Sequence, residues 1–477
     1  MATETRELAV FAWLPERDDP GFRPAGLLNL TQTRGAPLSG AALASEFRYG
    51  LRYLERPLSF EIDPVSLSLR DRNRVRGARL FPVNGLPEFG GIRDAAPDAW
   101  GRRVIEARRK VPANSLTEAE YLLDASSDRV GALDVRANRD APATSAASDL
   151  RSLEYLLQAA AAVEAGEPVP AALADLLAAG STAGGARPKA SVRDDRGVLW
   201  LAKFPARGDT FDVARAEYCT LELARRAGLT VPQLQVLDVS GRTVMLIRRF
   251  DRFWSVPGVA LPASGPLGEG EPVVGAREAR LPFVSGLTLV GCSEFESPTK
   301  RYADLALAIR EHVAAPCVRA DVEELFVRML FNVFVSNDDD HLRNHGFLRD
   351  PRMGGWRLSP LYDVVPRPGQ AHERYLHLEV GDQGKLATLD NALTHHPAFL
   401  GKRTRAIELM RRVWSTVRGW QSIFEELGAP GSLIDRIAPA IRDLDDIASP
   451  GLRAEIRRTA LRATVAQIPR AGQPGNA

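Results

Sequence analysis

The pattern of apolar and polar positions divides the chain into strand-rich and helix-rich stretches. Residues 8–14 form an apolar run, and residues 47–60 hold short apolar runs between turn residues, so we expect strands near the N-terminus. Apolar residues in 322–334 recur at i, i+3, i+4 and i+7, which predicts a buried helix. The short apolar stretches 346–349 and 356–359 then predict a hairpin.

The middle of the chain alternates predicted strands with a helix. Residues 198–204 and 243–250 have the composition of strands, and the apolar spacing of 213–227 between them is helical. Residues 254–280 are rich in Gly and Pro, which predicts a long surface loop.

These patterns predict an α+β protein with several parts. Residues 1–140 would form an N-terminal β-rich subdomain, and 141–252 a small lobe with a Gly-rich loop. Residues 253–468 would form a mainly helical C-terminal lobe, followed by a disordered tail at 469–477. The first boundary falls in 136–149, which is rich in Ala, Ser, Pro and Asp and has no period.

Composition adds limits on the class of protein. A chain of 477 residues with 45% hydrophobic and 26% charged residues is typical of a soluble protein with two or three domains. A formal charge of +2 gives no electrostatic reason for the whole chain to bind nucleic acid. The three cysteines have no CxxC spacing, which suits a reducing compartment. Without an apolar run of about 20 residues or a signal peptide, we expect a cytoplasmic protein with no membrane partner.

The strongest chemical signal is an acidic loop that follows the predicted helix at 322–334. Asp339 is followed five residues later by Asn344, and Asp363 comes after the predicted hairpin. Protein kinases use this spacing of catalytic Asp, metal-binding Asn and separate metal-binding Asp. Asp339 is therefore the candidate catalytic residue, and Asn344 and Asp363 are candidate ligands of Mg²⁺, which prefers oxygen. The alternative for the triple Asp 338–340 is a helix cap or a solvated acidic turn.

A lysine in a predicted strand supplies the candidate cofactor contact. Lys203 lies in an apolar run, where an unpaired ammonium is costly, so we expect it to contact phosphate and to pair with Glu217. The alternative is an edge-strand lysine that faces solvent. The strand at 243–250 would lead to a segment whose backbone binds adenine, with Phe250 in the cofactor site.

Small residues precede this strand. Gly184 and Gly185 allow backbone N–H groups to approach phosphate oxygens closely. The segment departs from a Walker A motif because Ala186 and Arg187 stand where Lys and Ser or Thr are required. It does not match the GxGxxG of kinases either, and a flexible loop is the alternative.

Taken together, these motifs resemble the HipA family, the serine/threonine kinase toxins of bacterial toxin–antitoxin systems. The resemblance extends over nearly the whole chain. It rests on Arg93-Asp94-x-x-Pro97-Asp98-x-Trp100-Gly101-Arg102, Gly184-Gly185-Ala186-Arg187-Pro188-Lys189, Lys203, Arg249-Phe250-Asp251-Arg252, Asp339-Asp340-His341-Leu342-Arg343-Asn344-His345-Gly346 and Ser359-Pro360-Leu361-Tyr362-Asp363.

The resemblance implies a protein-kinase-like bilobal fold with an additional N-terminal β-rich subdomain, and the use of ATP and Mg²⁺. Asp339 would match the family's catalytic Asp, Asn344 and Asp363 its metal-binding pair, and Lys203 its ATP-contacting lysine. Family members can autophosphorylate a hydroxyl of the Gly-rich loop, and the matching position is Thr182, with Ser181 beside it.

The resemblance also implies partners. The usual partner is a HipB-like helix-turn-helix antitoxin that binds operator DNA, so that DNA is contacted only through the antitoxin. Known targets of the family include aminoacyl-tRNA synthetases, which implies a growth-inhibiting toxin acting on a translation-related protein. Two alternatives stay open: a weakly active kinase-fold scaffold that acts as a co-repressor with the antitoxin, and a small-molecule kinase.

Overall fold

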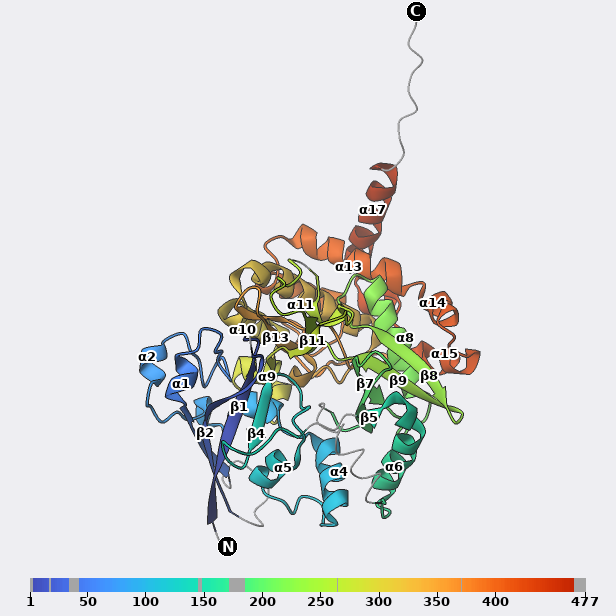
Figure 1. Cartoon of the computed structure of the whole chain (residues 1–477). Helices are drawn as coiled ribbons and strands as arrows, with labels where there is room; N and C mark the ends of the chain where they lie inside the picture. Colours follow the sequence, from blue (N-terminus) through green and yellow to red (C-terminus); the bar gives the residue numbers. More distant parts are fainter. Residues whose placement is uncertain are drawn as a thin grey trace, which may run out of the picture.

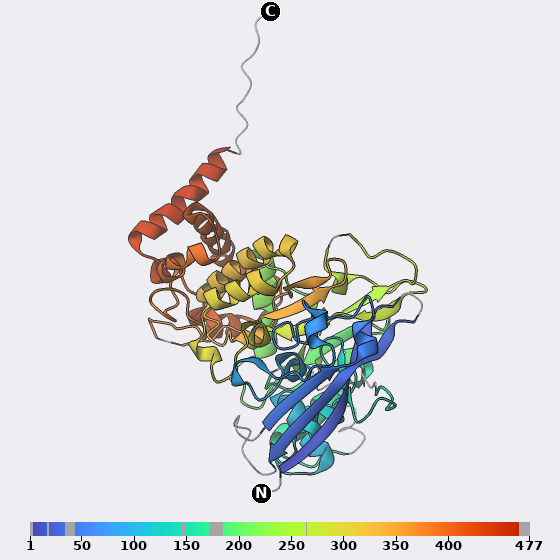
Figure 2. The same cartoon turned by 90° about the vertical axis from the view of Figure 1, so that its left-hand side faces the viewer.

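The computed structural model describes residues 3–16, 19–33, 43–144, 148–170, 185–263, 265–369 and 371–466. The predicted disordered tail at 469–477 lies outside these residues. Figure 1 shows an N-terminal sheet on the left, a second sheet on the right and a group of helices above them. Figure 2 shows the N-terminal strands and the C-terminal helices at opposite ends of the molecule.

The N-terminal part is built on an antiparallel sheet in the order β3-β2-β1-β4. Its strands are β1 Thr3–Leu14, β2 Gly21–Thr33, β3 Leu43–Tyr49 and β4 Leu133–Arg136. Helices α1 Leu51–Leu54, α2 Arg72–Val75, α3 Gly90–Asp94, α4 Ala99–Arg109 and α5 Glu118–Asp124 lie between β3 and β4 along the chain. The strand predicted at residues 8–14 is present as the second half of β1.

The strands predicted at residues 47–60 are only partly present, since the chain leaves the sheet after Tyr49 and turns into α1. Hydrogen bonds of Tyr53 hold the segment after α1 away from the sheet: its hydroxyl donates to the carbonyl of Phe60 (2.8 Å) and accepts from the N–H of Phe60 (3.1 Å). The segment therefore folds back around a buried tyrosine.

The second sheet has the order β5-β6-β7-β9-β8. Its strands are β5 Ser148–Asp149, β6 Lys189–Arg193, β7 Leu199–Lys203, β8 Leu234–Val239 and β9 Arg242–Arg248. Helix α6 (Leu153–Ala165) shares a hydrophobic core with this sheet, and α8 (Val213–Arg226) contacts β8 and β9. The predicted order of strand, helix and strand is confirmed here.

The C-terminal part is mainly helical, with two small sheets. Strands β10 (Arg252–Ser255) and β11 (Arg277–Arg280) pair with each other, and the other sheet has the order β12-β13-β14, with β12 Phe283–Ser285, β13 Gly346–Asp350 and β14 Gly355–Leu358. The helices are α9 Gly286–Val290, α10 Tyr302–His312, α11 Ala315–Val335, α12 Leu389–Thr394, α13 Arg403–Val417, α14 Trp420–Glu426, α15 Gly431–Ile437, α16 Leu444–Ile447 and α17 Pro450–Ala466.

The prediction of one long loop at residues 254–280 was wrong at both ends, which form the β10–β11 ladder. Most of the Gly and Pro residues lie between these two strands. Because they dominate the composition of the whole range, composition alone does not predict the short strand at each end.

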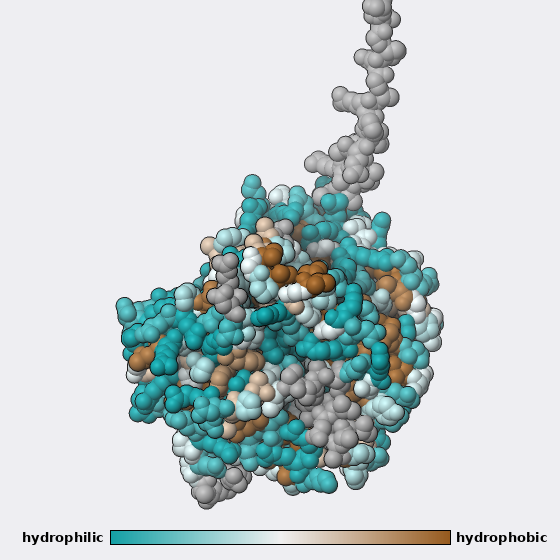
Figure 3. Space-filling view, in the orientation of Figure 1, coloured by the Kyte–Doolittle hydropathy of each residue, from teal (hydrophilic) through white to brown (hydrophobic). Residues whose placement is uncertain are grey.

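Helix α11 is the central element of the C-terminal part. Its residues from Leu325 to Val335 are all buried, and its last turn gives way to Ser336, which has a φ of 50°. This left-handed residue ends the helix and begins the acidic loop, as the sequence pattern predicts. Within the described residues, no helix combines the length and hydrophobicity needed to cross a membrane. The face in Figure 3 is mostly hydrophilic, with apolar residues in small scattered groups.

Candidate active site

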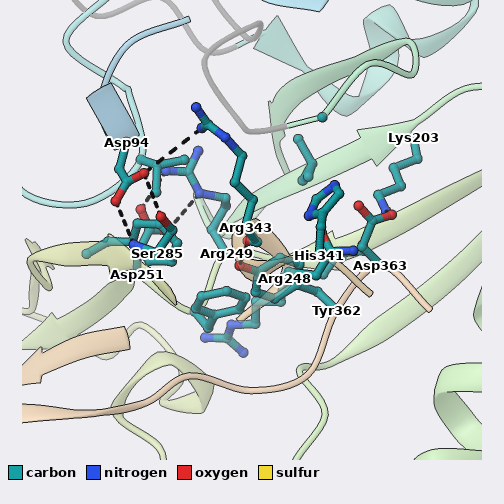
Figure 4. A pocket seen from close by; sticks show the side chains of 17 residues that line it. Asp94, Lys203, Arg248, Arg249, Asp251, Ser285, His341, Arg343, Tyr362 and Asp363 are labelled. Atoms are coloured by element: carbon teal, nitrogen blue, oxygen red, sulfur yellow. Dashed lines mark hydrogen bonds and ion pairs between the residues drawn. The ribbon is translucent and has the colours of Figure 1, made fainter. Parts of the chain in front are cut away.

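Three parts of the chain meet at one cavity (Figure 4). The second sheet contributes residues of β7 and β9, and the N-terminal part contributes the last residue of α3 and a residue just before β4. The C-terminal part contributes residues of β12, of the acidic loop and of the segment after the β13–β14 hairpin. The lining residues are Asp94, Val130, Gly185, Leu201, Lys203, Ile247, Arg248, Arg249, Phe250, Asp251, Phe283, Ser285, His341, Arg343, Asn344, Tyr362 and Asp363.

Lys203 links the sheet to the C-terminal part. Its Nζ donates to Oε1 of Glu217 on α8 (2.6 Å) and to Oδ1 of Asp363 (3.0 Å). Burial disfavours the ammonium, but the charges of Asp363 and Glu217 outweigh this and raise the pKa of Lys203 above its ordinary value. The lysine is thus held charged at the cavity wall, and the edge-strand alternative does not describe it.

Asp363 follows the β13–β14 hairpin and has a φ of 62°, which is unusual for a residue other than glycine. Burial favours its neutral form, but the positive charge of Lys203 outweighs burial and lowers its pKa to about 2. Strained backbone of this kind concentrates at functional sites. The carboxylate is therefore ionised and fixed in direction at the cavity.

Two neighbouring carboxylates of the acidic loop, those of Asp340 and Asp339, lie in different surroundings. The side chain of Asp340 is 1% exposed, and its Oδ2 accepts from Tyr302 Oη (2.5 Å) and Asn332 Nδ2 (2.7 Å). Nε2 of His345 lies 3.0 Å from the same oxygen. The side chain of Asp339 is 58% exposed. Asp340 therefore anchors the loop, while the carboxylate of Asp339 faces solvent.

Asp339 stands at the edge of the site and is not among the cavity-lining residues. Its Oδ2 lies 3.0 Å from Nη2 of Arg367, and Nε of the same arginine lies 3.1 Å from Oδ1 of Asp338. Exposed ion pairs of this kind contribute little free energy. The contact with Arg367 therefore holds the carboxylate of Asp339 only weakly in place.

Asn344 is buried beside the cavity, and its Nδ2 donates to the backbone carbonyl of Asp339 (3.0 Å). This bond uses the amide nitrogen and leaves the amide oxygen for a cation. Asn344 and Asp363 offer the hard oxygen donors that fit Mg²⁺, whose remaining ligands are usually water and phosphate. Among the described residues, no group of three or more His, Cys, Asp and Glu side chains is placed to hold a metal by itself.

Phe250 lies just after β9 and stacks on Tyr362, with ring centroids 5.7 Å apart. Phe250 and Tyr362 both line the cavity, as do the neighbours of Phe250 in sequence, Arg249 and Asp251. The charged residues on either side of Phe250 have another role, because Asp251 accepts from Arg249 Nη2 (2.6 Å), Arg252 Nη1 (2.7 Å) and the N–H of Gly131 (2.7 Å). This buried cluster joins the strand end to the N-terminal part.

The Gly-rich loop is only partly described. Gly185 lines the cavity with a φ of 111°, a conformation that favours glycine, while Gly184, Thr182 and Ser181 lie outside the described residues. A Cβ added to Gly185 would lie 2.8 Å from Nζ of Lys189. The backbone at Gly185 therefore covers a second lysine.

Several residues of the site carry no local sequence pattern that predicts their place in it. Asp94 accepts from the N–H of Ser285 (2.6 Å), and Arg343 contacts Glu294 and approaches Asp94 at 4.0 Å. Asp94 belongs to the family motif, but its contact with Ser285 joins residues 191 positions apart in sequence and leaves no local signal.

The comparison with protein families gives the identification. Residues 181–420, half of the chain, match the model of the HipA-like C-terminal domain. The chain belongs to the HipA family. The matched range contains the candidate residues Lys203, Glu217, Asp339, Asn344 and Asp363.

A solved structure extends the likeness of this HipA-family chain to its N-terminal part. HipA of Shewanella oneidensis MR-1, solved with HipB and operator DNA, aligns over 94% of this chain and 97% of its own, with a TM-score of 0.59 and 14% identity. At that identity the match shows the fold, which is α+β and kinase-like. The kinase CtkA of Helicobacter pylori aligns over 58% of this chain and 95% of its own, with a TM-score of 0.35 and 14% identity.

A curated relative matches a shorter stretch. The Sinorhizobium fredii protein named "Putative kinase Y4mE" is 26% identical over 168 residues, which are 35% of this chain and 34% of the relative. The match thus spans about a third of the curated relative's length.

Proposed function

We propose that this chain is an ATP- and Mg²⁺-dependent serine/threonine protein kinase of HipA type. The observation that carries the proposal is the placement of Lys203 between Glu217 and Asp363. Kinases use a strand lysine paired with a helix glutamate to hold ATP phosphates, and a separate Asp to hold Mg²⁺.

Each remaining residue has a role in this proposal. Asp339 orients the attacking hydroxyl and accepts its proton, which its exposed carboxylate permits. Asn344 and Asp363 would hold Mg²⁺ through oxygen atoms, and the chemistry that Mg²⁺ supplies is neutralisation of phosphate charge. Phe250 would pack against adenine beside Tyr362, and Gly184 and Gly185 would bring backbone N–H groups to the phosphates.

The proposed substrate is a hydroxyl group on a protein. We propose a growth-inhibiting toxin that phosphorylates a translation-related protein, such as an aminoacyl-tRNA synthetase, and that also transfers phosphate to Thr182 or Ser181 of its own chain. The proposed partner is a HipB-like antitoxin that contacts DNA. It is supported by the fold shared with the Shewanella protein, which was solved with HipB and operator DNA.

Phosphopeptide analysis tests the specificity. The wild-type chain is incubated with ATP, Mg²⁺ and a bacterial protein extract, and phosphorylated peptides are mapped by mass spectrometry. We expect new phosphoserine or phosphothreonine, in the chain itself or in an extract protein, and none with Asp339→Asn. Phosphate found on a free metabolite in place of protein would support a small-molecule kinase.

A further inference from the structure

A carboxylate of the N-terminal part reaches a lysine that lies next to Gly185. Oδ2 of Asp98 lies 3.0 Å from Nζ of Lys189, the first residue of β6. Both side chains are buried, with exposed fractions of 8% and 2%. The two residues are 91 positions apart, so that folding of the N-terminal part against the second sheet creates this pair.

Lys189 stands beside the proposed phosphate contact. It is the direct cross-strand partner of Lys203 in the β6–β7 ladder, and Gly185 covers its ammonium. Gly185, Lys203 and Asp363 line the cavity, and Lys189 lies buried directly behind Gly185 and Lys203.

The structure fixes Asp98 in place. Its Oδ1 accepts from the N–H of Gly101 (2.7 Å) and caps the N-terminus of α4. Two residues later, Trp100 is fully buried in the core of the second sheet and donates from Nε1 to the carbonyl of Lys189 (2.9 Å). The carboxylate and the strand that carries the lysine therefore move together.

Burial of Lys189 has a consequence for its charge. Burial and the neighbouring charge of Lys203 lower the pKa of Lys189 below its ordinary value, although the carboxylates of Asp98 and Asp363 oppose this shift. Two ammonium groups on facing strands repel each other, and each has its own counter-charge: Asp363 and Glu217 lie against Lys203, and Asp98 lies against Lys189. A buried ion pair is poor evidence of stabilisation, because desolvation offsets its attraction. The Asp98–Lys189 pair is better explained by a role in holding the ammonium of Lys189 in place for an anionic ligand than by a role in stability.

We propose that Asp98 is a positioning residue of the nucleotide phosphate site: it holds the ammonium of Lys189 under Gly185, and the N-terminal part thereby completes the site. The proposal deepens the kinase function proposed above and depends on it. The ligand it concerns is the anionic triphosphate of ATP, and the adenosine moiety is not involved.

Calorimetry on the full-length chain separates these two moieties. Dissociation constants are measured for ATP and for adenosine, each with Mg²⁺, using wild type, Asp98→Asn and Lys189→Met. Asn caps helices as well as Asp, so Asp98→Asn removes the charge and retains the cap. Asp71→Asn is the matched control, because Asp71 caps α2 in the same part of the chain through the N–H groups of Asn73 and Arg74.

We expect Asp98→Asn and Lys189→Met each to weaken ATP binding about tenfold or more, the size of a lost charge-assisted contact. Adenosine binding should change less than about twofold, and Asp71→Asn should bind both ligands as wild type does. The double variant Asp98→Asn/Lys189→Met should bind ATP no more weakly than Lys189→Met alone, because Asp98 acts through the lysine.

Two results would overturn the inference while leaving the kinase proposal intact. One is wild-type ATP affinity in Asp98→Asn, and the other is equal weakening of ATP and adenosine, which indicates general damage to the site. A wild-type chain that binds no ATP would instead overturn the proposed function, and this inference with it.

Discussion

The ammonium of Lys203 lies 3.0 Å from Oδ1 of Asp363, and this contact joins the second sheet to the loop after the β13–β14 hairpin. The two residues are 160 positions apart in sequence, and both line the cavity. Because Lys203 also binds Glu217 on α8, one side chain sets the relative positions of a strand, a helix and a loop.

Removing this charge should abolish phosphoryl transfer. Lys203→Met leaves Glu217 and Asp363 without their shared cation, and the phosphates of ATP without their proposed contact. We expect transfer to fall at least about 100-fold, the effect of losing a preorganised charge at a reacting centre. The measurement is the initial rate of label transfer from γ-labelled ATP.

The control for this prediction is Lys402→Met, since Lys402 is exposed at the start of α13, far along the chain from the site. The control should retain wild-type activity. A Lys203→Met protein with wild-type activity would remove Lys203 from the site.

The neighbours Asp339 and Asp340 should behave in opposite ways. Asp339→Asn changes an exposed side chain, so we expect an unchanged melting temperature and no phosphoryl transfer. Asp340→Ala removes a buried acceptor of bonds from Tyr302 and Asn332, and should lower the free energy of unfolding by about 2–4 kcal/mol. Denaturant unfolding and phosphoryl-transfer assays on both variants check these two predictions. Phosphoryl transfer by Asp339→Asn would contradict the assignment of Asp339 as the catalytic residue.

Asp321 should make stability depend on pH. Its Oδ2 accepts from the N–H of Leu358 (2.6 Å), yet burial raises its pKa from 3.8 to about 6. The folded state therefore holds this proton more tightly than the unfolded state does. The resulting stabilisation is complete below about pH 4 and is lost as pH rises through about 6, a loss of up to about 3 kcal/mol.

Asp321→Asn keeps an acceptor for the Leu358 N–H and removes the titration. Relative to wild type, we expect this variant to become more stable as pH rises from about 4 to about 7. Urea unfolding at both pH values measures the difference in free energy of unfolding between the two proteins. The other carboxylates are the same in both proteins, so their titration cancels in this difference. A constant difference between the two proteins over this range would contradict the prediction.

The sequence predicted the elements that carry local patterns. The helix spacing of 213–227 and the apolar run with Lys203 predicted α8, β7 and the ion pair to Glu217, which the structure contains. The two predicted strands around Gly354 and Gly355 are present as β13 and β14. In each case the pattern lies within about 15 residues, where periodicity and turn residues are informative.

The contacts between distant segments could not be predicted in this way. The pairs Asp98–Lys189 and Asp94–Ser285 join residues 91 and 191 positions apart, and neither end shows a period or spacing that points to the other. The cluster around Asp251 is similar, because Gly131 reaches it from 120 positions away. Such pairs form only when distant parts of the chain pack together, so local sequence patterns do not predict them.

The most direct test of the account is transfer of labelled phosphate. The purified chain is incubated with γ-labelled ATP, Mg²⁺ and a bacterial protein extract, beside Asp363→Asn treated in the same way, and labelled proteins are separated on a gel. The account predicts labelled protein with wild type, none with Asp363→Asn and none when Mg²⁺ is chelated. Equal labelling by wild type and Asp363→Asn, or no labelling above the extract alone with wild type, would contradict it.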